Sequence, residues 1–207
     1  MVKSRLMDVA VAHFGRRGFE GASTRDIATA ADTAMSSITY HFGGKEGLYL
    51  ACADHIAAQI RERQTEAFAL FLDAMSLTPD EAIERVLLVG DSMAVMMLDP
   101  ASADWARIVV REQQDPTEAF DRLWRGVMED LMLGVQALLS RICPNHSRIE
   151  LRALAILLFG QVMVMRSARA SVCKALEVEE LGQEQAARLR DRLRRNILAI
   201  LNAEKTR

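Results

Sequence analysis

Cysteine is scarce in this sequence, and its placement excludes two classes of protein. Only three of the 207 residues are cysteine, Cys52, Cys143 and Cys173, an odd number spread over separate helical segments. Such a set fits neither the disulfide framework of a secreted domain nor a cysteine-rich metal site. The four histidines also lie on separate segments without ligand spacing. We therefore expect no bound metal, and a reducing cytoplasm as the location.

Long apolar runs are lacking as well. The most apolar stretch, Leu151 to Met165, contains Arg152, Gly160 and Gln161 and is shorter than a membrane span. No leader peptide is indicated, because the sequence enters an amphipathic helix at its N-terminus. These absences predict a cytoplasmic protein without a membrane partner.

The residue patterns of common enzyme classes are also missing. Gly44-Lys45 has neither the earlier glycine nor the following Ser or Thr of a phosphate-binding loop. No serine lies in a strand-to-helix elbow, because no segment shows the alternation of a strand. Paired acids such as Glu129-Asp130 are typical of solvated helix surface. We therefore expect no catalytic residue, no cofactor and no enzymatic activity.

The composition that remains is that of an all-helical protein. Half of the residues are hydrophobic and only 5% are aromatic, and no internal repeat or low-complexity tract occurs. The formal net charge is −2, and the first fifty residues carry six basic against five acidic side chains. Overall charge therefore neither supports nor excludes a nucleic-acid partner, and any DNA affinity must come from a local patch.

One segment near the N-terminus has the pattern of a helix-turn-helix. Ser23 is a good N-cap for the first helix, and Asp26 completes a capping box. Asp32 falls at the turn, where aspartate tolerates a left-handed backbone. The second helix is expected over Met35–Phe42 and is ended by Gly43-Gly44. In this plan the second helix enters the major groove of DNA.

The outward side chains of this segment are of kinds that bond a phosphate or touch a base edge. Thr24 and Arg25 open the first helix, where backbone N–H groups and the helix dipole already favour a phosphate. The predicted DNA-binding residues are Thr24, Arg25, Met35, Ser36, Ser37, Thr39, Tyr40, His41 and Lys45. The alternative is that Tyr40 and His41 belong to the core and that the hydroxyl groups are ordinary surface.

Residues 5–50 resemble the N-terminal domain of the TetR/AcrR family of bacterial one-component regulators. The matching residues are Arg5, Ala10, Phe14, Gly18-Phe19, Ser23-Thr24-Arg25-Asp26-Ile27-Ala28, and the unbroken run from Tyr40 to Tyr49, which includes Leu48. The sequence departs from the family pattern at Asp32, Thr33 and Ala34 in the turn and at Thr39 in the second helix. Residues 111–120 resemble the ligand domain of the CecR-like branch of this family.

Capping residues and prolines divide the rest of the chain into helices. We expect helices over residues 1–17, 44–74, 79–99, a short one to 113, then 115–142, 147–172 and 182–202. Together with the helix-turn-helix this makes about nine helices. The expected organisation is a DNA-binding domain at residues 1–45 and a ligand-binding and dimerisation domain at residues 46–207.

The last two long helices are predicted to form a dimer interface. Each carries an apolar stripe at helical spacing, and apolar character extends round much of the first of them. The predicted interface residues are Leu151, Leu154, Leu158, Val162, Met165, Leu189, Leu193 and Ile197. A dimer lets two heads read two half-sites of DNA, and the resemblance to the TetR/AcrR family implies the same arrangement. The alternative is a helix pair buried within one subunit.

Residues 93–128 combine methionine with both tryptophans of the chain. The candidates for a small-molecule pocket are Met93, Met97, Trp105, Phe120, Trp124 and Met128. Methionine adapts its shape and tryptophan supplies a flat apolar wall, so this set suits an aromatic or apolar effector. A stripe of this kind is equally typical of plain core. Arg107, Arg111 and Glu112 are either polar anchors for a ligand or a solvated helix face.

These features together predict an all-α homodimeric transcriptional regulator. Its partners are expected to be palindromic double-stranded operator DNA and a small-molecule effector. We expect repression that ends when the effector shifts the population of conformations toward a head spacing that no longer fits two half-sites.

Overall fold

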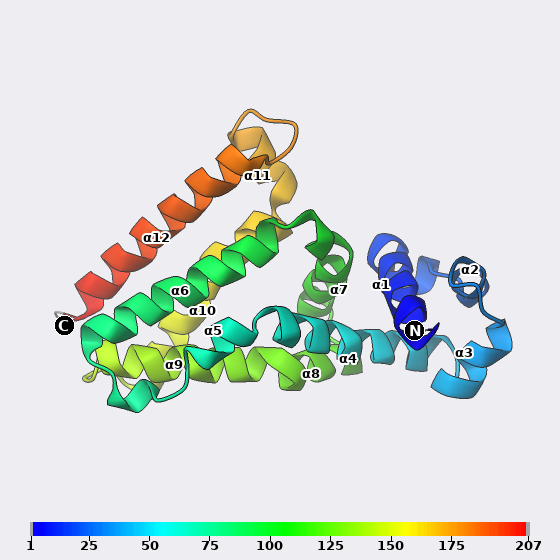
Figure 1. Ribbon diagram of the computed structural model, residues 1–207, viewed down its shortest axis with the longest axis horizontal. Helices are drawn as coiled ribbons and strands as arrows, with labels where there is room; N and C mark the ends of the chain where they lie inside the picture. The colour runs from blue at the N-terminus through cyan, green and yellow to red at the C-terminus, as the bar shows by residue number, and fades with distance from the viewer. Residues whose placement is uncertain (1, 206–207) are drawn as a thin grey trace. The chain divides into compact units, whose positions relative to one another are not determined.

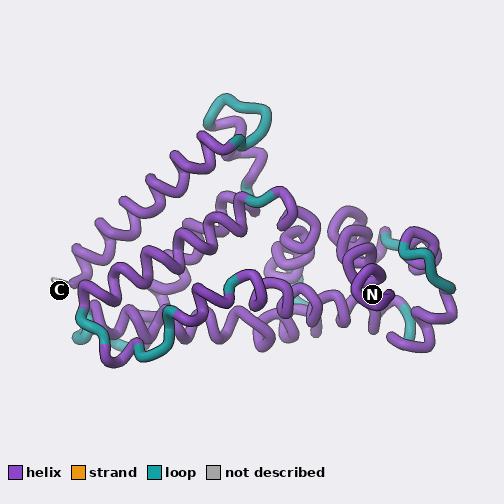
Figure 2. The backbone as a smooth tube through the Cα atoms, in the orientation of Figure 1, coloured by secondary structure: helices purple, strands orange, loops and turns teal. Residues whose placement is uncertain are grey.

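The computed structural model describes residues 2–205, with side chains from Arg5 onward, and these residues form helices and turns without a β-strand (Figures 1 and 2). The predicted all-α fold is confirmed. The chain divides into two compact units. Unit 1 comprises the residues up to Glu62 together with Ala101–Met128, and unit 2 comprises Arg63–Pro100 together with the residues from Glu129 onward. A functional division at residue 45 stays a prediction.

Unit 1 contains the helix-turn-helix and two helices from the middle of the chain. Its elements are α1 (Val2–Gly21), α2 (Thr24–Ala30), α3 (Met35–Phe42), nearly all of α4 (Lys45–Arg63), α7 (Ala103–Gln114), α8 (Glu118–Leu123) and the π-helical turn η3 (Trp124–Met128). Six of these helices bury large apolar side chains completely: Phe14, Ile27, Ile38, Leu48, Ile56, Ile108 and Leu123. Burying each such side chain contributes about 1.5–3 kcal/mol. Residues far apart in the sequence thus share this unit.

Unit 2 is a bundle of longer helices around α6. Its elements are α5 (Thr65–Ala69), η1 (Ala74–Ser76), α6 (Pro79–Leu98), α9 (Glu129–Ile142), α10 (Arg148–Ser167), α11 (Arg169–Ala175) and α12 (Gln183–Lys205). The short turn η2 (Pro100–Ser102) has its first residue in unit 2 and the other two in unit 1. Helix α6 packs against α9, α10 and α12, and Figure 1 shows α12 running beside it. Because neighbours cover it on several sides, α6 buries most of its apolar side chains.

The capping box predicted at α2 is only partly present. Complete capping boxes are formed by Thr78 and Glu81 at the start of α6 and by Ser147 and Glu150 at the start of α10. At α2, the hydroxyl of Ser23 accepts from the backbone N–H of Asp26 at 3.3 Å, as predicted. The carboxylate of Asp26 does not return that bond, because it accepts from the guanidinium of Arg17 at 2.8 Å. A charged donor makes a stronger bond to a carboxylate than a backbone N–H does.

The long helix expected over residues 44–74 is broken at Gln64. Helix α4 ends at Arg63, α5 begins at Thr65, and the side chain of Gln64 is buried. Its amide oxygen accepts from the hydroxyl of Ser92 at 2.8 Å, and its amide nitrogen donates to the Ser92 carbonyl at 3.4 Å. The helix expected over 147–172 is likewise divided, at Ala168. Neither Gln64 nor Ala168 makes a side-chain cap, so the residue types give no signal of these breaks.

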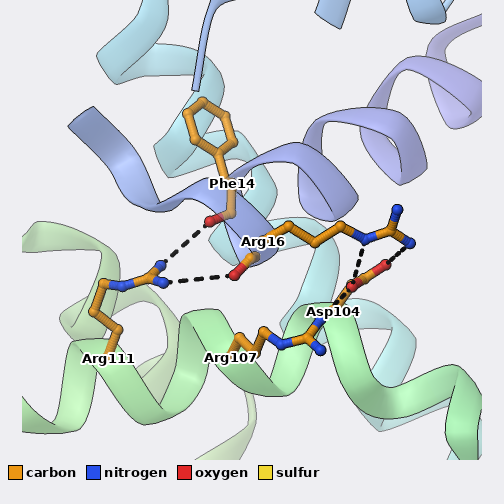
Figure 3. A network of polar contacts seen from close by, with 6 residues as sticks. Phe14, Arg16, Asp104, Arg107 and Arg111 are labelled. Carbon is orange, nitrogen blue, oxygen red and sulfur yellow. Dashed lines mark hydrogen bonds and ion pairs between the residues drawn. The ribbon is translucent and has the colours of Figure 1, made fainter. Parts of the chain in front are cut away.

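Helices α1 and α7 are joined by a polar network and by a close backbone contact (Figure 3). Gly18 has a left-handed backbone (φ 74°) and kinks α1. Just before this kink, the guanidinium of Arg111 donates to the carbonyl groups of Phe14 and Gly15 at 3.2 and 3.5 Å. Basic side chains commonly satisfy the last carbonyls of a helix in this way. Arg111 therefore caps the first part of α1 although it is 97 residues away from Phe14 in sequence.

A salt bridge and a glycine complete this junction. The guanidinium of Arg16 donates to the carboxylate of Asp104 at 2.8 and 3.1 Å, and Arg107 donates to the same carboxylate at 2.7 Å. A Cβ atom added at Gly15 would lie 2.2 Å from the backbone oxygen of Asp104. The absence of a side chain at this one position lets the two helices approach.

We therefore expect Gly15→Ala to destabilise the protein. The added methyl group meets backbone rather than a mobile side chain, so the helices must separate, at a cost of about 1–3 kcal/mol. The measurement is the denaturant midpoint followed by circular dichroism. Gly21→Ala is the matched control, because its Cβ would meet only the Cβ of Arg17 at 3.5 Å. Equal midpoints for the two variants would show that the close contact is absent.

Candidate nucleic-acid interface

The helix-turn-helix forms as the sequence predicts. Helix α3 covers Met35–Phe42, and Asp32 in the turn has the left-handed backbone (φ 55°) expected of it. Ile27 on α2 and Ile38 on α3 are both fully buried and hold the two helices together. Helix α3 ends at Gly43, whose φ of 73° favours glycine. The turn and both helix ends are thus set by residues within the motif.

The outward face of α3 is open to solvent. The side chain of Tyr40 is 85% exposed and that of Met35 is 53% exposed. Ser36, Thr39 and His41 are also exposed, and Ser37 is half-buried. The alternative interpretation, in which Tyr40 and His41 belong to the core, is therefore wrong. Their contact with DNA stays a prediction.

Three further predicted DNA-binding residues lie at helix starts next to α3. Thr24, half-buried, and Arg25, exposed, open α2, and Lys45 opens α4. The ammonium of Lys45 donates to the backbone carbonyl of Glu20 at 3.1 Å and lies 4.8 Å from the centre of the Phe19 ring. Lys45 is thus held at the end of α1 by two contacts that its helix-start position alone does not indicate.

The predicted dimer residues mostly belong to the core of unit 2. Leu158, Val162, Met165, Leu193 and Ile197 are between 2% and 5% exposed, while Leu151, Leu154 and Leu189 are half-buried. Because their own chain already covers the first five, these side chains are not available to a second subunit. For them the prediction is wrong, and burial within one subunit, the alternative given above, describes them correctly.

A different face of α10 is apolar and exposed. Its side chains are Ile149, Ile156, Leu157 and Val164, which are between 46% and 70% exposed. Gly160 also lies on the exposed surface, and nothing is within 4 Å of the position of its missing Cβ. The sequence does carry this signal, since α10 is apolar on most sides, but a hydropathy pattern does not say which side the subunit itself covers.

The predicted pocket residues are distributed over both units. Met93 and Met97 are buried in unit 2, and Trp105 is buried in unit 1. Phe120 and Trp124 stack on each other with ring centres 6.2 Å apart, with Trp124 37% exposed, and Met128 is half-buried. Of the six, Met93 lines an apolar cavity of about 40 Å³ in unit 2. Residues of α6, α9, α10 and α12 form its walls.

The described residues from 2 to 205 contain no group of three or more His, Cys, Asp or Glu side chains placed to hold a metal ion. No single helix in this part of the chain is long and apolar enough to cross a membrane. Two consecutive helical stretches, Pro79–Leu98 and Pro100–Gln114, are long and apolar enough only when they are taken together, and by length and composition alone.

A buried acid in unit 1 has a more definite place than the sequence indicates. Glu112 on α7 is 2% exposed, so it is neither a solvated face nor an open anchor. Its carboxylate accepts from the Tyr49 hydroxyl at 2.7 Å and from the N–H and hydroxyl of Thr117 at 3.0 and 2.8 Å. One sequence signal indicates this burial. Glu112 follows Ile108 by four residues, about one helical turn, and so lies on the same apolar face of the helix.

Comparisons with known proteins agree with this arrangement. Residues 6–52 match the model of bacterial regulatory proteins of the tetR family. The dual regulator CecR of Shigella flexneri is 31% identical over 179 residues, which are 82% of this chain and 78% of that protein. The helix-turn-helix is therefore followed by a body that is related to that of a known regulator.

Solved structures show the same fold. A TetR-family regulator from Streptomyces coelicolor superposes with a TM-score of 0.69 at 17% identity, over 99% of this chain and 90% of that chain. The regulator FadR from Bacillus subtilis, solved in complex with stearoyl-CoA, gives a TM-score of 0.66 at 17% identity over 98% of each chain. At these identities the two structures establish the fold alone.

The C-terminal part supplies the more extensive match. Residues 79–204, more than half of the chain, match the model of the C-terminal domain of the transcriptional dual regulator CecR. The resemblance found in the sequence is confirmed for both parts: the chain belongs to the TetR family of DNA-binding bacterial transcriptional regulators, with a C-terminal domain of the CecR type.

Proposed function

We propose that this protein is a homodimeric repressor that binds a palindromic operator and leaves it when a small molecule binds unit 2. The observation that carries the proposal is the solvent-exposed outer face of α3, with Tyr40 85% exposed above the buried Ile38. An exposed helix of this kind fits the major groove, where side chains reach base edges and phosphates. Thr24, Arg25 and Lys45 supply phosphate contacts on either side of it.

The second subunit is proposed to pack against the exposed face of α10. Ile149, Ile156, Leu157 and Val164 recur at helical spacing, and Gly160 lets a second helix approach closely. Exposed apolar patches of this kind favour association. A dimer then places two α3 helices for two half-sites of one operator. Binding both half-sites at once raises the affinity for the palindrome.

The effector is proposed to be an apolar molecule that enters the cavity in unit 2. The cavity is lined by aliphatic side chains, methionine and Phe159, without a charged group. Its volume of about 40 Å³ is too small for a ligand of drug size, so binding must move the side chains of Met93 and Met132 or the helices that carry them. The binding of stearoyl-CoA by FadR, which has the same fold, is consistent with an apolar effector.

Binding to the protein's own upstream DNA is the first test of this function. We expect Tyr40→Ala to abolish specific binding in a gel shift, since a proposed contact to the groove wall is lost. The melting temperature should change little, because a side chain this exposed contributes little to folding. Ile38→Ala is the contrasting variant, since Ile38 is fully buried. Undiminished binding by Tyr40→Ala would remove α3 from the interface.

Two neighbouring leucines test the dimer. Leu157 is 69% exposed and Leu158 is 5% exposed. We expect Leu157→Glu to sediment as a folded monomer of 23.1 kDa, because the new charge lies in the proposed interface. Leu158→Ala should instead remain dimeric and lose about 2–5 kcal/mol of stability. A wild-type protein that is monomeric at micromolar concentration contradicts the proposal.

Filling the cavity tests the effector site. Ala155 lines the cavity, so Ala155→Val should occupy part of it. We expect apolar compounds that raise the melting temperature of the wild type to lose this effect on Ala155→Val, since ligands stabilise only the state that binds them. Ala199→Val, on the exposed side of α12, is the control for the change in helix propensity. An unchanged thermal shift in Ala155→Val would place the effector elsewhere.

A further inference from the structure

The carboxylate of Glu112 is the starting point for a chain of contacts within unit 1. It is 2% exposed and accepts three hydrogen bonds, one from Tyr49 and two from Thr117. Burying a carboxyl group is costly unless hydrogen bonds replace its water. Here those bonds come from α4 and from the residue that caps α8. Glu112 therefore fixes the position of Tyr49 relative to α7.

The Tyr49 side chain is the next link. It is 5% exposed, and its burial, together with the hydrogen bond to Glu112, raises the pKa of the Tyr49 hydroxyl, which therefore keeps its proton and donates. The Tyr49 ring makes edge-to-face contacts with the rings of Phe14 and Phe19, with ring centres 5.0 and 5.2 Å apart. Edge-to-face pairs of this kind have defined geometry. Tyr49 thus holds the Phe19 ring in one orientation.

The Phe19 ring in turn holds Lys45. The ammonium of Lys45 lies 4.8 Å from the ring centre and donates to the carbonyl of Glu20 at 3.1 Å. A cation is attracted to the face of an aromatic ring, so the orientation of Phe19 decides where the ammonium rests. Lysine has a flexible stem and is not held by its own backbone. Its position at the start of α4 therefore depends on Phe19.

We propose that Glu112 is a positioning residue for DNA binding, which acts through Tyr49 and Phe19 to place the Lys45 ammonium for its phosphate contact. This inference rests on the proposed function, because the phosphate contact of Lys45 belongs to that proposal. Glu112 lies in α7, outside the helix-turn-helix, and is 67 residues from Lys45 in sequence. A purely structural role for Glu112, as a cap for α8, would affect stability but not the Lys45 contact.

A double-mutant cycle distinguishes the two roles. The affinity for the protein's upstream DNA is measured against salt concentration for the wild type, Glu112→Gln, Lys45→Ala and the double variant. Lys45→Ala should lower the salt slope by about one unit, as the loss of one phosphate contact does. Glu112→Gln should weaken binding about fivefold in the wild-type background and less than about twofold in the Lys45→Ala background, because side chains in one network are coupled.

Matched variants keep this test independent of folding. Tyr49→Phe removes only the hydroxyl, and Phe19→Leu keeps an apolar side chain but removes the ring face. Both variants should lower the affinity for DNA, and both should lower the salt slope in the same direction as Lys45→Ala. They test the chain of contacts even if Glu112→Gln does not fold. Glu118→Gln is the control, since Glu118 is exposed and pairs with Arg122 at 2.8 Å instead. It should leave the salt slope unchanged.

Two results would overturn the inference, and they are separable. If Lys45→Ala lowers the salt slope but Glu112→Gln, Tyr49→Phe and Phe19→Leu weaken binding equally with and without Lys45, the positioning role is wrong while the phosphate contact stands. If Lys45→Ala changes neither affinity nor slope, the proposed contact is wrong, and its positioning by Glu112 falls with it.

Discussion

The packing of α1 against α7 depends on a contact that only glycine permits. With no side chain at Gly15, the backbone of α7 at Asp104 comes close enough to touch α1. Arg111 lies seven residues further along α7, two helical turns on the same face, and so reaches the carbonyls at the kink of α1. Its neighbour Glu112 is then buried beside Tyr49 of α4. The absence of a side chain at Gly15 thus allows α1, α4 and α7 to make these contacts with one another.

The sequence predicts the helix-turn-helix well because its signals are local. Ser23 caps α2 through a residue three positions away, and Asp32 and Gly43 adopt the left-handed backbone that their residue types tolerate. The cap and the two left-handed conformations each depend only on residues within one helical turn. The interactions that the sequence does not predict involve distant partners. Gln64, where α4 ends, accepts a hydrogen bond from Ser92. The Asp26 carboxylate accepts from Arg17 instead of completing the capping box.

The two larger differences concern which side of a helix is covered. Helix α10 is apolar on most sides, and its periodicity does not distinguish the stripe with Leu158 from the face with Leu157. Only the neighbouring helices decide that the first is core. Glu112 is the opposite case, since a charged residue type indicates surface. Its burial becomes understandable once Tyr49, 63 residues earlier, supplies a donor.

Unit 1 is discontinuous in sequence, because residues 101–128 join it from the middle of the chain. This limits how such regulators can exchange parts. A recombination event that replaced the DNA-reading segment by crossing over after residue 45 would separate α1 from Asp104 and Arg111, and Phe19 from Tyr49. The new α1 would have to present its own small residue to the old α7. Inheritance should therefore couple residues 1–62 to residues 101–128, while the helices of unit 2 are free to diverge separately.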